Sequence, residues 1–205
     1  MTIVLIIITV AISVLAFQNR SMFIRLQFNP YQVFHRREYY RILSHGFIHA
    51  NWWHLFVNMF VLYFFGSTVE LYLGQLAANG IIRYPVLIFI VFYLLAIVFA
   101  ASMSLYRHRD DPWYNSVGAS GAVSAVLFFS IFFDPWNMIG VYFIPVPGII
   151  FAVLYVAYSH YQSKRGGDNI AHDAHLLGAV FGFVFPLFLE LELIRHFISK
   201  LLMYA

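Results

Sequence analysis

The chain has 205 residues, of which 62% are hydrophobic and 10% are charged. A soluble domain carries about 25% charged residues, so this composition excludes one and indicates a helical protein that crosses a lipid bilayer several times. The lack of cysteine excludes disulfides and thiol chemistry. A net charge of +3 without a basic stripe argues against nucleic-acid binding. The length fits a single membrane domain over residues 1–205.

Six apolar stretches predict six membrane-spanning helices. Residues 2–17 form the first, which we interpret as a retained span because it has neither the basic start nor the cleavage site of a signal peptide. The others are expected at residues 53–73, 82–103, 118–133, 144–161 and 171–189, followed by an amphipathic tail. Gly74 and Asp134-Pro135 are interpreted as helix stops, and Pro145 and Pro147 as part of a first helical turn. The predicted fold is therefore all-α, a bundle of six transmembrane helices.

Residues 18–53 form an unusually long connection between the first two predicted spans. It carries five arginines and many aromatic residues, and Asn29-Pro30 marks a turn within it. Long connections are usually functional or disordered, and arginine mixed with aromatic residues is typical of the membrane interface. We therefore expect an ordered, interfacial first loop.

The stretch Gly118-Ala119-Ser120-Gly121 stands at the start of the fourth apolar run. Glycine allows close approach of another chain, and a helix N-terminus offers N–H groups and partial positive charge. Together they suit a serine nucleophile beside a developing oxyanion, although small residues are equally typical of helix packing in membranes. At ~1.5 Å per residue the run spans about 24 Å, which is less than the ~30 Å hydrocarbon core, so Ser120 is expected below the membrane surface. Ser124, one turn further, is expected to be dispensable.

His54 and Asn58 are polar residues inside a predicted span, where polar side chains are costly and default to a functional hypothesis. They are four residues apart and share one helix face, so both can donate hydrogen bonds toward one point. Two alternatives remain open. One is hydrogen bonding between helices, and the other is metal ligation together with the nearby His45 and His49.

His175 stands three residues before Gly178, which with Gly182 forms the small-xxx-small spacing that lets two helices touch. If the partner is the small-residue face at Gly118–Ala125, the His175 imidazole reaches Ser120. His172 is a turn higher and is expected at the aqueous rim. Asp173 lies on roughly the opposite face, so it cannot orient His175. We therefore predict a Ser-His dyad whose base is placed by packing, with an aromatic such as Tyr or Phe as a candidate.

At this point the sequence resembles the rhomboid family of intramembrane serine proteases, in its minimal six-helix form and over essentially the whole chain. The motifs that carry the resemblance are His54-x-x-x-Asn58, Gly118-x-Ser120-Gly121, Ala174-His175-x-x-Gly178-x-x-x-Gly182, Glu38-Tyr-Tyr-Arg41 with Ser44-His45, and Gly66 with Glu70. Tyrosine stands in the first-loop motif where tryptophan is usual.

The resemblance implies that Ser120 is the nucleophile and His175 the general base, with His54, Asn58 and the Ser120 N–H binding the oxyanion. It also implies a substrate that is a transmembrane segment of another protein, cleaved within the lipid bilayer without a metal or cofactor. The expected location is a membrane crossed several times, taken to be the bacterial inner membrane.

Access for the substrate is expected past the fifth helix and the loop at residues 162–169, which contains Gly166-Gly167. Aromatic side chains of an outer wall would gate it, so shrinking them to alanine is expected to raise the cleavage rate or to loosen sequence preference. These aromatics are Phe143, Phe151, Tyr155 and Tyr158.

Two other functions remain alternatives. The first is a metal-dependent membrane hydrolase that uses the histidine-rich set His45, His49, His54, His172 and His175. The second is a catalytically dead relative that binds membrane proteins for quality control.

Overall fold

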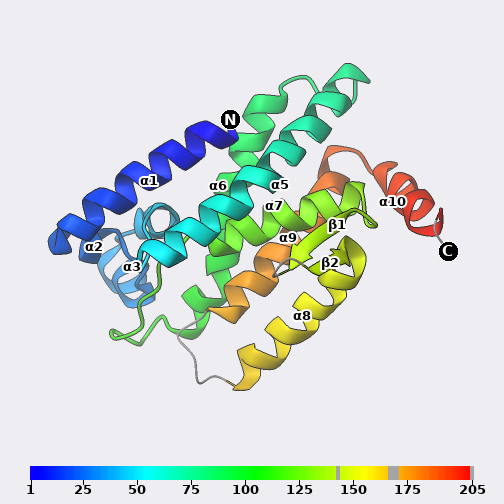
Figure 1. The fold of residues 1–205 in the computed structure, drawn as a ribbon. Coiled ribbons are helices and arrows are strands. Elements are labelled where there is room, and N and C mark those ends of the chain that lie inside the picture. Colours follow the sequence, from blue (N-terminus) through cyan, green and yellow to red (C-terminus); the bar gives the residue numbers. More distant parts are fainter. Residues whose placement is uncertain (142–143, 166–170, 204–205) are drawn as a thin grey trace.

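The computed structural model describes residues 1–141, 144–165 and 171–203, and the fold is mostly helical (Figure 1). The predicted loop glycines Gly166 and Gly167 and the predicted wall residue Phe143 lie outside these described residues. In chain order the elements are α1 (Thr2–Gln18), α2 (Arg20–Leu26), α3 (Pro30–Arg36), α4 (Arg41–Ser44), η1 (His45–Phe47), α5 (Trp52–Ala78), α6 (Pro85–Arg107), α7 (Ser120–Phe133), β1 (Met138–Val141), β2 (Ile144–Pro147), α8 (Gly148–Arg165), α9 (His172–Leu189) and α10 (Leu193–Leu202).

Helix α7 is the centre of the bundle. Every residue from 121 to 133 is buried, and α5, α6, α8 and α9 all pack against the helix (Figure 1). With 14 residues, α7 is about 21 Å long at ~1.5 Å per residue, shorter than the ~30 Å hydrocarbon core. The surrounding helices therefore supply the shielding that a polar group at its N-terminus needs inside a membrane.

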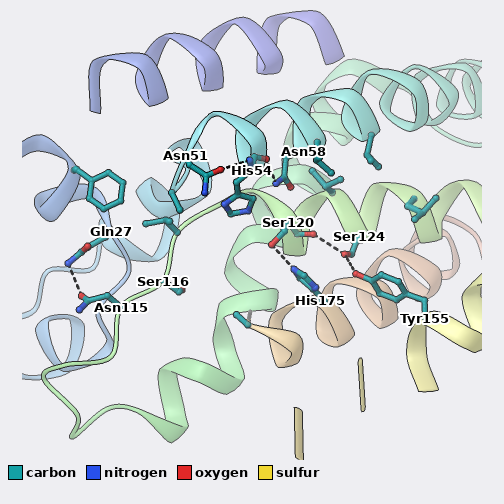
Figure 2. A pocket seen from close by; sticks show the side chains of 18 of the residues that line it. Gln27, Asn51, His54, Asn58, Asn115, Ser116, Ser120, Ser124, Tyr155 and His175 are labelled. Atoms are coloured by element: carbon teal, nitrogen blue, oxygen red, sulfur yellow. Dashed lines mark hydrogen bonds between the residues drawn. The ribbon is translucent and has the colours of Figure 1, made fainter. Parts of the chain in front are cut away.

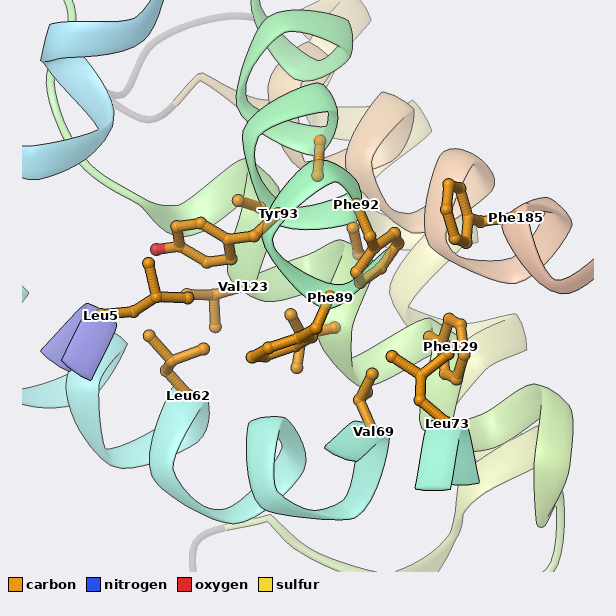
Figure 3. Close-up of a cluster of buried hydrophobic side chains, with 14 of the residues drawn as sticks. Leu5, Leu62, Val69, Leu73, Phe89, Phe92, Tyr93, Val123, Phe129 and Phe185 are labelled. Atoms are coloured by element: carbon orange, nitrogen blue, oxygen red, sulfur yellow. The ribbon is translucent and has the colours of Figure 1, made fainter. Parts of the chain in front are cut away.

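Interlocked aromatic rings hold α6, α7 and α9 together (Figure 3). The Phe92 ring centroid lies 5.2 Å from that of Phe129 and 4.7 Å from that of Phe185. These separations fall in the ~4.5–7 Å range in which aromatic pairs attract. Many large apolar side chains on the outside of the bundle, such as Ile7 and Phe56, stay exposed. An apolar core inside an apolar surface is what a lipid solvent requires.

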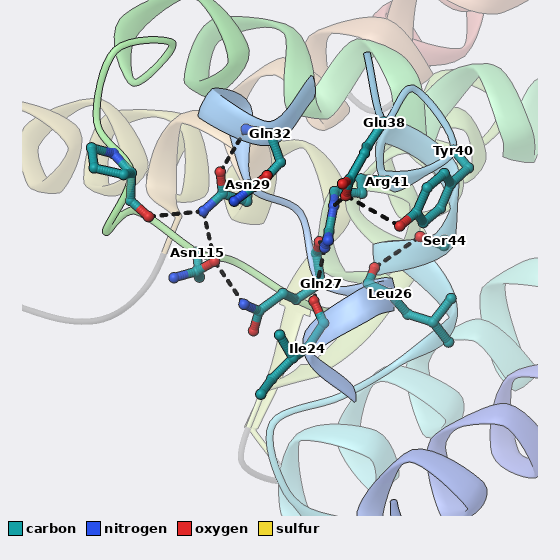
Figure 4. A network of polar contacts seen from close by, with 11 residues as sticks. Ile24, Leu26, Gln27, Asn29, Gln32, Glu38, Tyr40, Arg41, Ser44 and Asn115 are labelled. Atoms are coloured by element: carbon teal, nitrogen blue, oxygen red, sulfur yellow. Dashed lines mark hydrogen bonds and ion pairs between the residues drawn. The ribbon is translucent and has the colours of Figure 1, made fainter. Parts of the chain in front are cut away.

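Arg41 organises the first loop (Figure 4). Its side chain is buried, and it donates to the carbonyl oxygens of Ile24 and Gln27 at 2.8 Å each while its Nε bonds Glu38 at 2.6 Å. This ion pair lowers the pKa of the Glu38 carboxyl below its usual range. The motif Glu38–Arg41 thus fastens α4 to the end of α2. The predicted order of this loop is confirmed, whereas its position at a membrane interface stays a prediction.

Several helix starts follow from local sequence. Asn29 and Asn51 are N-caps whose side chains accept hydrogen bonds from backbone N–H groups, and Pro85 opens α6 at the first turn. The predicted stop at Gly74 is wrong, because α5 continues to Ala78 and ends in the turn where Gly80 has a φ of 73°. One glycine inside a long apolar helix lowers its stability without ending it.

The prediction of a purely helical fold is wrong at residues 138–141 and 144–147. There β1 and β2 pair antiparallel, with Met138 opposite Pro147 and Val141 opposite Ile144. The physical reason is that a residue before proline is pushed out of the helical region. Pro145 and Pro147 impose this on Ile144 and Val146, so the segment becomes extended and α8 begins only at Gly148.

Among the described residues, three helices are long and apolar enough to cross a membrane, namely Trp52–Ala78, Pro85–Arg107 and His172–Leu189. Thr2–Gln18 and Ser120–Phe133 are apolar but shorter. Apolar helices suited to a membrane are therefore present, and the count of six spans stays a prediction.

Candidate active site

Ser120 is the first residue of α7, and the chain that leads into it is held from two sides. Gly118 has a φ of +118°, a conformation that favours glycine, and its N–H donates to the carbonyl of His45 at 2.9 Å. The His54 imidazole lies directly over Gly118, since a Cβ built there would stand 2.5 Å from the ring carbon Cε1. Glycine is therefore required here both for its conformation and for the space it leaves.

Ser120 and His175 form a hydrogen-bonded pair. The distance from Ser120 Oγ to His175 Nε2 is 2.8 Å, within the ~2.6–3.2 Å that proton transfer requires. Gly178 and Gly182, which we call the glycine seam, bring α9 against α7 as their spacing predicts. A Cβ on Gly178 would overlap the carbonyl oxygen of Gly121, and a Cβ on Gly182 would overlap that of Ala125. Helix α9 therefore touches α7 backbone to backbone.

His54 and Asn58 line the same cavity as the Ser120–His175 pair (Figure 2). The cavity has a volume of about 810 Å³ and extends from α2 to α8. Asn58 Nδ2 donates to the His54 carbonyl at 2.8 Å, and an amide carries two N–H donors, so the group retains a second one. All four predicted site residues thus converge on one cavity, from α5, α7 and α9.

His45 and His49 lie behind the site and support it. His49 Nε2 accepts the Ala119 N–H at 3.4 Å, so its other nitrogen, Nδ1, is the one that donates, to Ser13 Oγ at 3.0 Å. Ser13 in turn donates to the carbonyl of Phe47 at 3.0 Å. Burial, followed by the neighbouring His54, lowers the pKa of His49 to about 3. Burial also lowers the pKa of His45 to about 4, and its Nδ1 bonds the Arg41 carbonyl. Both side chains are therefore neutral.

The five histidines do not converge as a metal hydrolase would require. Across the described residues, no group of three or more histidine or acidic side chains could hold a metal ion. His45 and His49 bond to the backbone under the Gly118 turn, while His172 and His175 belong to α9 on the other side of the cavity.

The structure differs from the sequence interpretation at His172. This residue was expected at an aqueous rim, yet it is buried, with its ring edge-on to Tyr158 at 5.7 Å and 6.1 Å from the His175 ring. Helix α8 covers His172 through Tyr158. The sequence of α9 alone does not show how α8 is placed against it. Asp173 points away from the pair as expected, toward Arg107 and Ser163, with which it forms close polar contacts.

Sequence reasoning did not anticipate the contacts of Ser124, and it assigned Tyr155 to an outer wall. Ser124 Oγ donates to the Ser120 carbonyl at 2.8 Å and lies 2.6 Å from the Tyr155 hydroxyl. Tyr155 faces into the cavity rather than forming an outer wall (Figure 2). Ser124 stands four residues after Ser120 in the sequence, but nothing local shows which helix covers it.

A family model described as the rhomboid domain matches residues 36–191. The chain belongs to the rhomboid family.

Two curated relatives are similar to this chain. One is "RHOMBOID-like protein 12, mitochondrial" of Arabidopsis thaliana, which is 30% identical over 67% of this chain and 43% of its own length. The other is "Rhomboid-related protein 1" of Caenorhabditis elegans, which is 28% identical over 83% of this chain and 45% of its own length. The chain thus matches less than half the length of either relative. Both are eukaryotic proteins, so they give no support to the expected bacterial inner membrane.

Proposed function

We propose that this protein is an intramembrane serine endopeptidase that cleaves transmembrane segments of other proteins. The observation that carries the proposal is the 2.8 Å contact between Ser120 Oγ and His175 Nε2 inside a cavity that His54 and Asn58 also line. Membership of the rhomboid family suggests the same class of activity.

In this mechanism His175 is the general base. Nε2 takes the proton of Ser120 while Oγ attacks the scissile carbonyl carbon, and the protonated imidazole then gives that proton to the leaving amine. The resulting acyl-enzyme is hydrolysed when His175 removes a proton from a water molecule, which attacks the same carbon. The bond from that carbon to Ser120 Oγ then breaks, and His175 returns the proton to Oγ, which releases the acid product and restores the serine. A serine without an adjacent base is a weak nucleophile, so both residues are needed together.

The oxyanion of the tetrahedral intermediate is stabilised by His54, Asn58 and the Ser120 N–H. Ser120 is the first residue of α7, where backbone N–H groups lack partners within the helix and carry the positive end of its dipole. Removing one such donor typically lowers turnover about 10²- to 10³-fold.

The substrate is a membrane-spanning segment that has locally unwound. Its scissile carbonyl must leave the helical hydrogen bond before Ser120 can attack, so weak helix formers such as glycine near the cut favour cleavage. The apolar lining of the cavity suits such a segment, with Val57, Val61, Leu127 and Phe151 around the polar site residues. No metal or cofactor takes part in these steps.

The test is labelling of the purified protein with a fluorophosphonate, together with cleavage of a transmembrane reporter. We expect Ser120→Ala and His175→Asn to lose both, while Ser102→Ala, at an exposed serine of α6, keeps both. Cleavage by Ser120→Ala near the wild-type rate would show that Ser120 is not the nucleophile. Reporter binding without labelling or cleavage in the wild type would instead identify a catalytically dead binder, and activity abolished by a chelator would identify a metal hydrolase.

A further inference from the structure

Tyr155 connects α8 to the residue that carries the nucleophile. Its hydroxyl oxygen lies 2.6 Å from Ser124 Oγ, and Ser124 Oγ donates to the backbone carbonyl of Ser120 at 2.8 Å (Figure 2). A serine hydroxyl has one proton, which the carbonyl accepts here, so the Tyr155 hydroxyl is the donor to Ser124. A continuous hydrogen-bonded chain therefore runs from the middle of α8 to the first turn of α7.

The same side chain also contacts the base. The ring centroids of Tyr155 and His175 are 6.4 Å apart with 27° between their planes, within the distance at which aromatic rings attract. Phe151 and Phe128 hold the Tyr155 ring from other sides, at 5.5 and 5.4 Å. Tyr155 thus contacts His175 directly and Ser120 only through Ser124, and the packing of Phe151 and Phe128 fixes its ring.

Asp173, the nearest acid on α9, bonds to other residues and does not orient His175. Asp173 Oδ2 pairs with Arg107, and its other oxygen accepts from Ser163 on α8. A reacting pair must be held within about 0.5 Å of its productive geometry by neighbouring side chains. Tyr155 and Ser124 meet this requirement from α8 and α7.

We propose that Tyr155 is a positioning residue that makes the geometry of Ser120 and His175 depend on the placement of α8. The proposal rests on the proposed proteolytic function. Helix α8 lies at the periphery of the bundle, against α9 and α7, and exposes Val153, Leu154 and Tyr158 on its outer face (Figure 1). When α8 moves outward, Tyr155 leaves Ser124 and His175 together. When α8 returns, the hydroxyl chain forms again and the pair is aligned.

This dependence gives the helix a role beyond that of a wall. A segment that enters past α8 displaces Tyr155, so Ser120 is misaligned while the cavity is open and aligned after α8 has closed over the bound segment. One hydroxyl–hydroxyl bond between membrane helices is weak enough to break and form reversibly. The expectation that shrinking Tyr155 speeds cleavage is thereby reversed.

The experiment compares Tyr155→Phe, Ser124→Ala and the double variant with wild type, at a temperature at which all are folded. The matched control is Tyr161→Phe, which removes a hydroxyl from an exposed tyrosine of the same helix. We measure kcat and KM for a transmembrane reporter, the rate of Ser120 labelling by a fluorophosphonate, and the NMR shifts of the His175 ring. Each single variant is expected to lower kcat and labelling about 3- to 30-fold, with KM unchanged and the His175 ring shifts altered.

A double-mutant comparison tests whether the two hydroxyls act as one unit. Because they share a hydrogen bond, the double variant is expected to lose no more than the worse single variant. If the losses of kcat in the two single variants multiply in the double variant, the proposal is contradicted. It is also contradicted if Tyr155→Phe raises only KM, or if this variant keeps both the wild-type labelling rate and the wild-type His175 shifts. A wild-type protein that is never labelled at Ser120 contradicts the proposed function instead, and the His175 shifts of Tyr155→Phe then decide the positioning role by themselves.

Discussion

At the scale of the residue, the site depends on the absence of a side chain at Gly118. Its φ of +118° is costly for any other residue, and a Cβ would stand 2.5 Å from Cε1 of His54. His54 and the turn into Ser120 are therefore fitted to each other, and a shift of either disturbs the proposed oxyanion donor or the proposed nucleophile.

Gly118→Ala is expected to lower kcat for a transmembrane reporter about 10- to 1000-fold, because His54 must move away from the oxyanion. The unfolding free energy falls by about 1–3 kcal/mol from backbone strain. Reporter kinetics and thermal unfolding check both effects. Gly140→Ala is the control, since a Cβ there meets nothing within 4 Å. Unchanged turnover in Gly118→Ala would mean that His54 takes no part in the reaction.

At the scale of the element, the contact between α7 and α9 determines whether Ser120 and His175, the proposed nucleophile and base, meet. Gly178 and Gly182 face the backbone of α7 so closely that a Cβ on either would overlap a carbonyl oxygen. Backbone cannot yield as a flexible side chain does, so even alanine separates the helices. This separation acts directly on the 2.8 Å contact of His175 with Ser120.

Gly178→Ala is expected to reduce the unfolding free energy by about 1–3 kcal/mol and to slow fluorophosphonate labelling of Ser120 at least tenfold. Gly74→Ala is the matched control, because a Cβ at this glycine near the C-terminal end of α5 meets nothing within 4 Å. There the substitution is expected to stabilise the protein by about 0.5–1 kcal/mol. A Gly178→Ala protein as stable and as reactive as wild type would contradict the close seam.

At the scale of the whole molecule, two buried histidines make stability depend on pH. The pKa of His45 is about 4 and that of His49 about 3 in the folded protein, against 6.5 ordinarily. Below pH 6.5 the unfolded chain binds protons that the folded chain does not, so the unfolding free energy falls as the pH falls. The unfolding free energy falls from about pH 6.5 down to about pH 4 through His45, and down to about pH 3 through His49.

Between pH 6.5 and 5, each of these histidines is expected to lower the unfolding free energy by about 1.5 kcal/mol. Thermal unfolding at a series of pH values measures the effect as a falling Tm. His49→Gln is expected to show a flatter dependence, because one of the two buried histidines is then absent. A Tm that is constant down to pH 5 would show that His45 and His49 are protonated in the folded state.

The sequence by itself determined the features that are local or periodic. Helical period places His54 and Asn58 on one face and His175 above Gly178, and these residues line one cavity or one seam in the structure. The apolar runs located the long helices, because the hydrophobicity of a segment can be evaluated from its own residues alone. The sequence did not determine every helix end. Gly74 lies inside α5, and Pro145 and Pro147 belong to a strand rather than to a helix.

The tertiary structure decided which side chains support the site. Ser124 and Tyr155 are 31 residues apart, and Ser13 and His49 are 36 apart, so no local pattern relates them. Their contacts depend on how α8 and α1 are placed against the bundle, which follows from packing of the whole chain rather than from any one segment. For the same reason, only the assembled helices revealed that His172 is covered and that Tyr155 faces His175.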